Sequence, residues 1–129
     1  MIEGRRRDVR IRPVALPVTA ALVALGLTTG ATAMAAPKLQ GTIGPGFTIA
    51  LKDARGKTVK TLRHGSYTFV VSDKSSIHNF TLNGPGISNK TITGTSFVGS
   101  KTVTLTVKKG SYRFYCTVHP TVSGTFKVT

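Results

Sequence analysis

From about residue 47 to its end, the chain alternates polar with apolar residues. A period of two is typical of β-strands that bury one face and leave the other in water. The pattern predicts strands at residues 47–51, 66–70, 78–82, 102–107, 111–115 and 125–128. Turn formers such as Gly44-Pro45-Gly46 and Lys108-Lys109-Gly110 separate them, and no stretch shows helical periodicity with caps. We therefore expect an all-β domain, a small antiparallel sandwich of short strands.

The first 35 residues follow a different pattern. An arginine-rich start precedes an uncharged stretch at 13–37, and Ala33 and Ala35 supply the small residues of a cleavage site. This order predicts a secretory signal peptide over residues 1–35 and a mature domain over 36–129. The alternative is an uncleaved membrane anchor, because about 20 apolar residues can span a bilayer. In both cases we expect the domain outside the cytoplasm, in the periplasm, in the cell envelope or secreted.

Length and cysteine content limit what can stabilise the domain. The chain has 129 residues, 40% of them hydrophobic, which suits one packed domain. Its single cysteine, Cys116, excludes an internal disulfide, although export would permit one. Stability must therefore come from the apolar core, with a bound metal as a further source.

The expected mature domain is strongly basic. Ten lysines and three arginines stand against Asp53 and Asp73, a formal charge of about +11. The charge suits an acidic protein or an anionic envelope, and solubility alone is an equal alternative. Nucleic acid is disfavoured, because export removes the usual target and the lysines are scattered between the predicted strands without exposed aromatic residues. Membrane contact is expected only through an uncleaved N-terminal segment or through surface charge.

The candidate chemistry lies in Cys116-Thr117-Val118-His119-Pro120 and in the much earlier His78. Two imidazoles and one thiolate are the strong donor set of a mononuclear blue-copper site. The same trio could hold zinc, but a structural zinc site takes four protein ligands. Two plain alternatives stay open: Cys116 as a buried apolar thiol and His78 as a core histidine.

Enzymatic activity is not expected from this sequence. A multicopper oxidase needs many histidines, and the whole chain has three. A Cys-His protease pair would need a third, orienting group and an oxyanion-hole segment, and neither is visible.

A family resemblance now becomes clear. The run at 65–73, then His78-Asn79-Phe80, then the run at 110–120 and Gly124-Thr125-Phe126 resemble the cupredoxin family of plastocyanins, amicyanins and azurins. The resemblance covers essentially all of residues 36–129. It implies a Greek-key β-sandwich and one copper ion held by His78, Cys116 and His119. It also implies that Asn79 ties the two ligand-bearing loops together by hydrogen bonds, and that Phe80 is a core aromatic beside the site.

One position departs from the family. Amicyanin-like members have an axial methionine three residues after the second histidine, and Val122 stands there. We expect a three-coordinate copper capped by Val122, with the Ile77 carbonyl at long range, as the resemblance to azurin allows. Loss of a weak axial donor favours Cu(I) and predicts a raised reduction potential. The alternative is a site that has lost its metal role.

The sequence thus predicts a monomeric blue copper protein that carries single electrons between redox partner proteins, which its charge suggests are acidic. His119 is expected to be the electron port, within an apolar rim that includes Pro120, Val122 and Pro85. The alternative function is copper binding and delivery outside the cytoplasm, without a redox shuttle.

Overall fold

The computed structural model describes residues 10, 12–21, 26 and 29–129. The chain divides into two compact units, Met1–Thr32 and Ala33–Thr129. The predicted signal peptide falls partly on residues 1–9, 11, 22–25 and 27–28, outside the described part, so it stays a prediction. Among the described residues, no helix has the length and hydropathy needed to cross a membrane.

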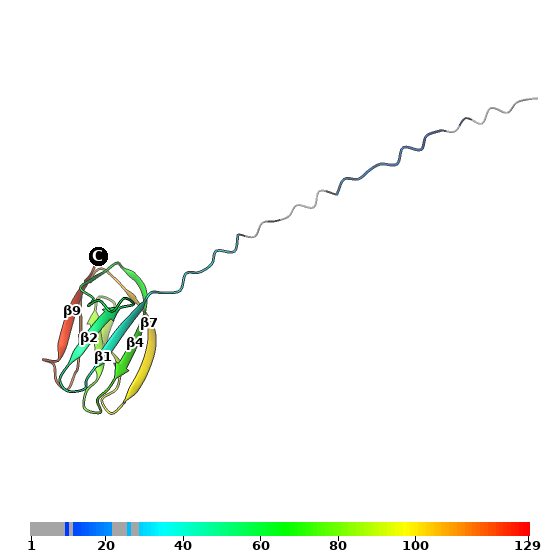
Figure 1. Cartoon of the computed structure of the whole chain (residues 1–129). Helices are drawn as coiled ribbons and strands as arrows, with labels where there is room; N and C mark the ends of the chain where they lie inside the picture. Colours follow the sequence, from blue (N-terminus) through cyan, green and yellow to red (C-terminus); the bar gives the residue numbers. More distant parts are fainter. Residues whose placement is uncertain (1–9, 11, 22–25, 27–28) are drawn as a thin grey trace, which may run out of the picture. The chain divides into compact units, whose positions relative to one another are not determined.

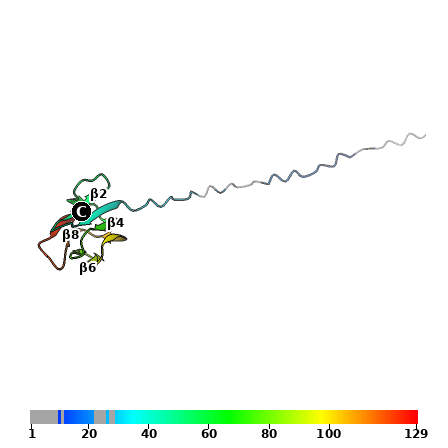
Figure 2. The ribbon, with the colours of Figure 1, turned by 60° about the horizontal axis from the view of Figure 1, so that its bottom comes forward.

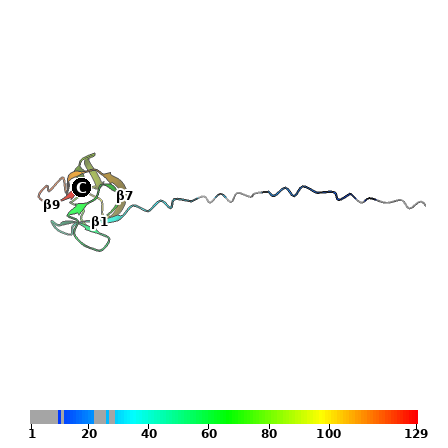
Figure 3. The same cartoon turned by 90° about the horizontal axis from the view of Figure 1, so that it is seen from above.

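Residues 33–129 form a β-sandwich of nine strands. The strands are β1 (Lys38–Ile43), β2 (Ile49–Asp53), β3 (Thr61–Leu62), β4 (Gly65–Asp73), β5 (Phe80–Gly84), β6 (Ile87–Thr93), β7 (Gly99–Val107), β8 (Gly110–Tyr115) and β9 (Ser123–Val128). One sheet has the order β2-β1-β4-β7 and the other β3-β9-β8-β5-β6. Figure 1 shows the first sheet face-on, and Figures 2 and 3 show the strands from two steeper directions. The expected all-β sandwich is confirmed.

The strand pattern differs from the expectation in the number of strands, in their limits and in their pairing. β1, β3 and β6 were not predicted, β2 begins at Ile49 instead of residue 47, and β5 begins at Phe80 instead of residue 78. β1 pairs parallel with β4 and β3 parallel with β9, whereas the other pairings are antiparallel. β6 escaped prediction because four consecutive exposed residues interrupt its alternation.

A glycine in β1 explains why the alternation of polar and apolar residues did not predict that strand. Leu39 and Ile43 are buried, but Gly41 stands between them on the same face. A Cβ at Gly41 would lie 3.1 Å from the Phe80 ring and 3.0 Å from a Val71 methyl group. The aromatic ring thus fills the place of the missing side chain, and the apolar alternation of β1 is lost from the sequence.

The core lies between the two sheets and is built largely from aromatic rings. Phe80 stacks on Phe114 with centroids 5.8 Å apart, and Tyr112 stacks on Phe126 at 5.1 Å. All buried apolar side chains among the described residues lie between Leu39 and Val128. The domain therefore contains its own core, and we expect it to fold without the N-terminal segment.

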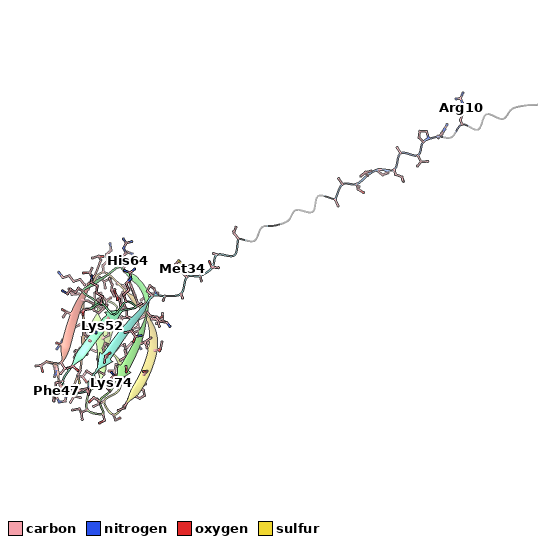
Figure 4. All side chains as sticks on the ribbon, in the orientation of Figure 1. Arg10, Met34, Phe47, Lys52, His64 and Lys74 are labelled. Atoms are coloured by element: carbon pink, nitrogen blue, oxygen red, sulfur yellow. The ribbon has the colours of Figure 1, made fainter. Side chains whose placement is uncertain are left out.

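Four loops meet at one end of the sandwich. Ile43 pairs with Ile49 and with Asp73, which itself pairs with Gly99, so the loops at 44–48, 74–79 and 94–98 share this end. Tyr115, opposite Thr81 and Ser123, brings the loop at 116–122 to the same end. We call this the site end, because the candidate residues lie there, and the opposite one the far end. Figure 4 shows Phe47 and Lys74 at the site end and His64 at the far end.

Candidate metal centre

The structure brings the three predicted ligands together from two separate segments. His78 lies in the loop before β5, Cys116 directly follows β8, and His119 lies in the loop between β8 and β9. Their donor atoms are all within 4.8 Å of one another. Cys116 and His78 are fully buried, whereas His119 is half-buried. Among the described residues this is the one such cluster, and it forms a possible copper-binding site.

The two imidazoles present the same nitrogen to each other. The Nδ1 atoms of His78 and His119 are 3.1 Å apart, and the ring centroids are 4.8 Å apart at an interplanar angle of 74°. Metal–imidazole bonds are about 2.0–2.1 Å long, so one ion can contact both atoms. With the thiol close by, the donor set combines a soft sulfur with two imidazoles, which suits copper.

The environment of His78 argues against a purely structural role. Its ring is 0% exposed, yet among the described residues no group hydrogen-bonds to Nε2. Within the described part of the chain, the one group at hydrogen-bond distance from its ring is the Nδ1 atom of His119. Buried polar groups in native proteins are nearly always satisfied, and a core histidine kept for packing would have protein partners. A ligand role would account for two imidazoles that direct their Nδ1 atoms at each other in a buried setting, which packing alone does not explain.

The sulfur of Cys116 accepts a hydrogen bond from the backbone. The Asn79 N–H group lies 3.4 Å from Sγ in a buried setting. A donor directed at the sulfur stabilises negative charge on a thiolate, and such bonds tune the potential of copper–thiolate sites.

The Asn79 side chain joins three segments at the site end. Its Nδ2 group donates to Thr117 Oγ1 at 2.6 Å and to Thr95 Oγ1 at 3.2 Å. Its Oδ1 atom accepts from the Thr117 N–H group at 3.0 Å and from the Thr81 hydroxyl at 3.0 Å. The amide is buried, with 4% of its surface exposed. The segments that carry His78 and Cys116 are therefore held in a fixed relation.

The ligand loop closes on itself through the backbone. The Cys116 N–H group donates to the Val122 carbonyl at 3.0 Å, and the Val122 N–H group donates to the His119 carbonyl at 2.9 Å. Val122 is buried, with 6% exposed. The loop thus holds an apolar residue at the place predicted for an axial ligand, and its capping of a copper ion stays a prediction.

The other residues expected around the site occupy different surroundings. Phe80 is fully buried and stacks in the core, whereas the Ile77 side chain is 51% exposed, and its carbonyl as a distant ligand stays a prediction. Pro120 is exposed, and its carbonyl accepts from the Arg113 guanidinium. Pro85 was wrongly expected in the rim: its carbonyl accepts from the Tyr112 hydroxyl at 2.7 Å, beside Gly110 at the far end.

Phe47 belongs to the site, although the sequence pattern assigned it to a strand. Its ring lies edge-to-face against both imidazoles, with centroids 5.1 Å from His78 and 5.1 Å from His119. It is nevertheless 66% exposed. Phe47 directly follows the turn formers Gly44-Pro45-Gly46. This position after a turn was the one feature of the sequence that could have indicated that Phe47 lies in a loop.

We expect Asn79→Ala to weaken the centre by releasing the segments that carry the ligands. The substitution leaves the Thr117 N–H group and neighbouring hydroxyls without their partner, at about 1–3 kcal/mol for an unsatisfied buried group. Copper should be lost faster to a chelator, and the free energy of unfolding should fall. Asn83→Ala, which removes an exposed bond to the Asn89 N–H group, is the matched control. Equal copper retention in both variants would contradict the role assigned to Asn79.

Comparisons with known proteins reveal structural matches only. No family model and no curated protein sequence matches the chain. Among solved structures, a methionine-to-glutamine mutant of rusticyanin matches with a TM-score of 0.48 and 19% identity, over 71% of this chain and 76% of that one. Rusticyanin from Thiobacillus ferrooxidans matches with a TM-score of 0.45 and 21% identity, over the same shares of the two chains, 71% and 76%. A reduced tryptophan-to-tyrosine mutant of amicyanin matches with a TM-score of 0.46 and 16% identity, over 74% and 86%.

Rusticyanin and amicyanin are thus distant structural neighbours of this chain. Since the likeness is distant, the case for a metal rests on the donor atoms themselves. The domain is an all-β sandwich with cupredoxin neighbours, and its cluster of His78, Cys116 and His119 fits a type 1 copper site.

Proposed function

We propose that the domain is a type 1 copper protein that carries single electrons between proteins outside the cytoplasm, and that it is no enzyme. One observation carries the proposal: a buried thiol and two imidazole Nδ1 atoms 3.1 Å apart lie close together, and among the described residues His78 has no hydrogen-bond partner other than His119. Copper, when bound, would supply the one-electron couple Cu(I)/Cu(II). His78, Cys116 and His119 would hold it.

The protein's contribution is to keep the donors in one arrangement. Four side-chain hydrogen bonds at Asn79 and two backbone bonds within the 116–122 loop fix the segments that carry the ligands. Because Cys116 and His78 are fully buried, water is kept from two of the three donors. A fixed, dry donor set changes little between oxidation states, and this favours fast electron transfer.

His119 is the donor nearest to solvent, and apolar side chains surround the end where it lies. Each of the four loops exposes one large apolar residue: Phe47 is 66% exposed, Ile77 51%, Val98 60% and Val118 52%. Lys74 is the one lysine or arginine in these loops, and they contain no acidic residue. An exposed apolar patch is typical of a protein interaction site. We therefore assign His119 as the electron port and the site end as the docking surface.

The remaining assignments extend this function. We propose that residues 36–129 form the mature copper domain, that residues 1–35 are removed on export, and that the domain works as a monomer with redox proteins in the periplasm, envelope or medium. The acidic character of a partner stays a prediction from the charge.

Reversible redox chemistry of the copper-loaded domain tests the function. Full reduction and reoxidation by a one-electron mediator, with the visible band lost and regained and the metal retained, would support a carrier. A domain that stays in the Cu(I) form and passes its metal to an apo-protein would instead indicate copper delivery.

A lysine in the apolar patch should slow electron exchange. In Val118→Lys, two copies that meet through their site ends must bring like charges together, and we expect self-exchange between the Cu(I) and Cu(II) forms to slow on the order of ten-fold. Line broadening in nuclear magnetic resonance spectra of mixed samples gives this rate. Thr102→Lys adds the same charge at an exposed position of β7 and is the control. An equal slowing in both variants would mean that the copies do not meet through the site end.

A further inference from the structure

The positive charge of the domain gathers at the far end. Six exposed cations occupy the turns of that end: Arg55, Lys57, Lys60, Arg63, Lys108 and Lys109. The sequence had suggested lysines scattered between the strands. The structure corrects this, because turns that are separate in the sequence lie together at one end of the sandwich.

Pairing between strands brings these turns side by side. Gly65 pairs with Val107, which places Arg63 and Lys109 near each other, and both line a hollow together with His64 and Thr129. Lys57 and Lys60 line a neighbouring hollow with Asp53. The Lys127 N–H group donates to the Lys60 carbonyl at 3.0 Å, and the Lys127 side chain adds another exposed cation beside them.

The two ends of the domain are therefore electrically different. Asp53 is the one acidic side chain among the described residues of the far end, and its Oδ1 atom is used by the N–H groups of Arg55 and Lys57. The loops of the site end contain Lys74 as their one lysine or arginine, and the side chains of Lys101 and Arg113 reach them from β7 and β8, so this end carries fewer cations than the far end. A positive field at one end orients the domain towards a negative surface before any contact forms.

The connection of the chain indicates which negative surface this is. β1 runs from Lys38 at the far half to Ile43 at the site end. The chain therefore enters the domain in its far half, and the apolar stretch at 13–37 precedes this point in the sequence. The sequence predicts that this stretch enters a membrane, either as a signal peptide or as a retained anchor.

We propose that the far end rests on an anionic lipid bilayer and that the copper end faces away from it, free to meet redox partners. Lysine and arginine side chains within a Debye length of anionic headgroups are attracted to them, and salt weakens the attraction. Nucleic acid fits this end less well, because the one aromatic residue among the exposed large apolar side chains of the described part, Phe47, lies at the site end. The inference goes beyond the proposed function, and membrane binding itself does not depend on copper.

Sedimentation with vesicles tests the binding, with residues 36–129 as the protein. The domain should bind vesicles that contain phosphatidylglycerol, should not bind pure phosphatidylcholine, and should be released by salt. Lys57→Gln, Lys60→Gln and Lys109→Gln together should weaken binding on the order of a hundred-fold, at about five-fold for each basic side chain. Lys74→Gln, Lys90→Gln and Lys101→Gln remove the same charge outside the far end and should have a much smaller effect.

Tryptophan fluorescence tests the orientation, because the chain has no tryptophan of its own. Ala54→Trp places one at an exposed turn of the far end, and Val98→Trp places one at the site end. Vesicles with a quencher on the lipid headgroup should quench the first and spare the second.

Three results would overturn the proposal. The first is equal loss of vesicle binding in the two triple variants, which would mean that binding depends on the net charge of the domain and not on the far end. The second is equal quenching of both tryptophans. The third is tighter binding to a short DNA duplex than to anionic vesicles at the same salt concentration. None of these results affects the copper site, whose test is the visible spectrum.

Discussion

Cys116→Ser is expected to abolish the intense visible absorption of the Cu(II) domain. That colour arises from charge transfer between a thiolate and copper, and Cys116 is the only cysteine in the chain. Its thiol is fully buried and within 4.8 Å of both histidine donors, so no other residue can supply the sulfur. The absorption spectrum after stoichiometric addition of Cu(II) is the measurement. We expect complete loss of the band, the largest effect of any single substitution considered.

The control must separate loss of the ligand from loss of the fold. A hydroxyl in a buried apolar site costs about 1–3 kcal/mol if it is left unsatisfied. Circular dichroism and amide resonances should therefore show that the variant keeps its sheets. Thr121→Ser, an exposed change in the same loop, should keep the colour. A wild-type domain that takes up Cu(II) without colour would disprove the site, and a coloured serine variant would place the ligand elsewhere.

The second large effect is expected at Val122, the residue that stands where a methionine is usual in the family. Val122→Met would offer a weak thioether donor from a buried position, which stabilises Cu(II) relative to Cu(I). The reduction potential should fall by about 59 mV or a few times that, where 59 mV is a tenfold change in a one-electron equilibrium. The blue colour should remain, because the thiolate is unchanged. Voltammetry of the two proteins under the same conditions gives the difference.

Val122→Leu provides the matched comparison, since it enlarges the side chain without adding sulfur. A potential that falls in the methionine variant and not in the leucine variant would locate Val122 at the axial position. If both variants shift equally, packing of the loop is the cause. If neither shifts, Val122 does not face the metal, and the path of the loop after His119 differs from the one argued here.

The metal ligands could be predicted because two of them lie close together in the sequence and because few residue types bind copper strongly. Cys116 and His119 lie three positions apart after a strand, and thiolates and imidazoles are the donors that copper prefers. The contact of Phe47 with both imidazoles could not be predicted, because it depends on how the 44–48 loop folds over a distant segment. Similarly, Arg63 and Lys109 become neighbours only through the pairing of β4 with β7. Alternation along a strand predicts which of its side chains face the core. It does not predict which loops of distant strands come together at one end of the sandwich, and these contacts depend on that.

The glycine in β1 has a consequence for how the sequence can vary. Phe80 occupies the space above Gly41, and Phe80 directly follows Asn79 and His78. Even a single methyl group at position 41 would require the ring to move by a few tenths of an ångström. That displacement would be passed along the backbone to the amide that holds the two ligand segments. Variation at position 41 is therefore restricted by the metal centre as well as by the core, and Gly41→Ala would be noticed first as a change in colour rather than as a loss of fold.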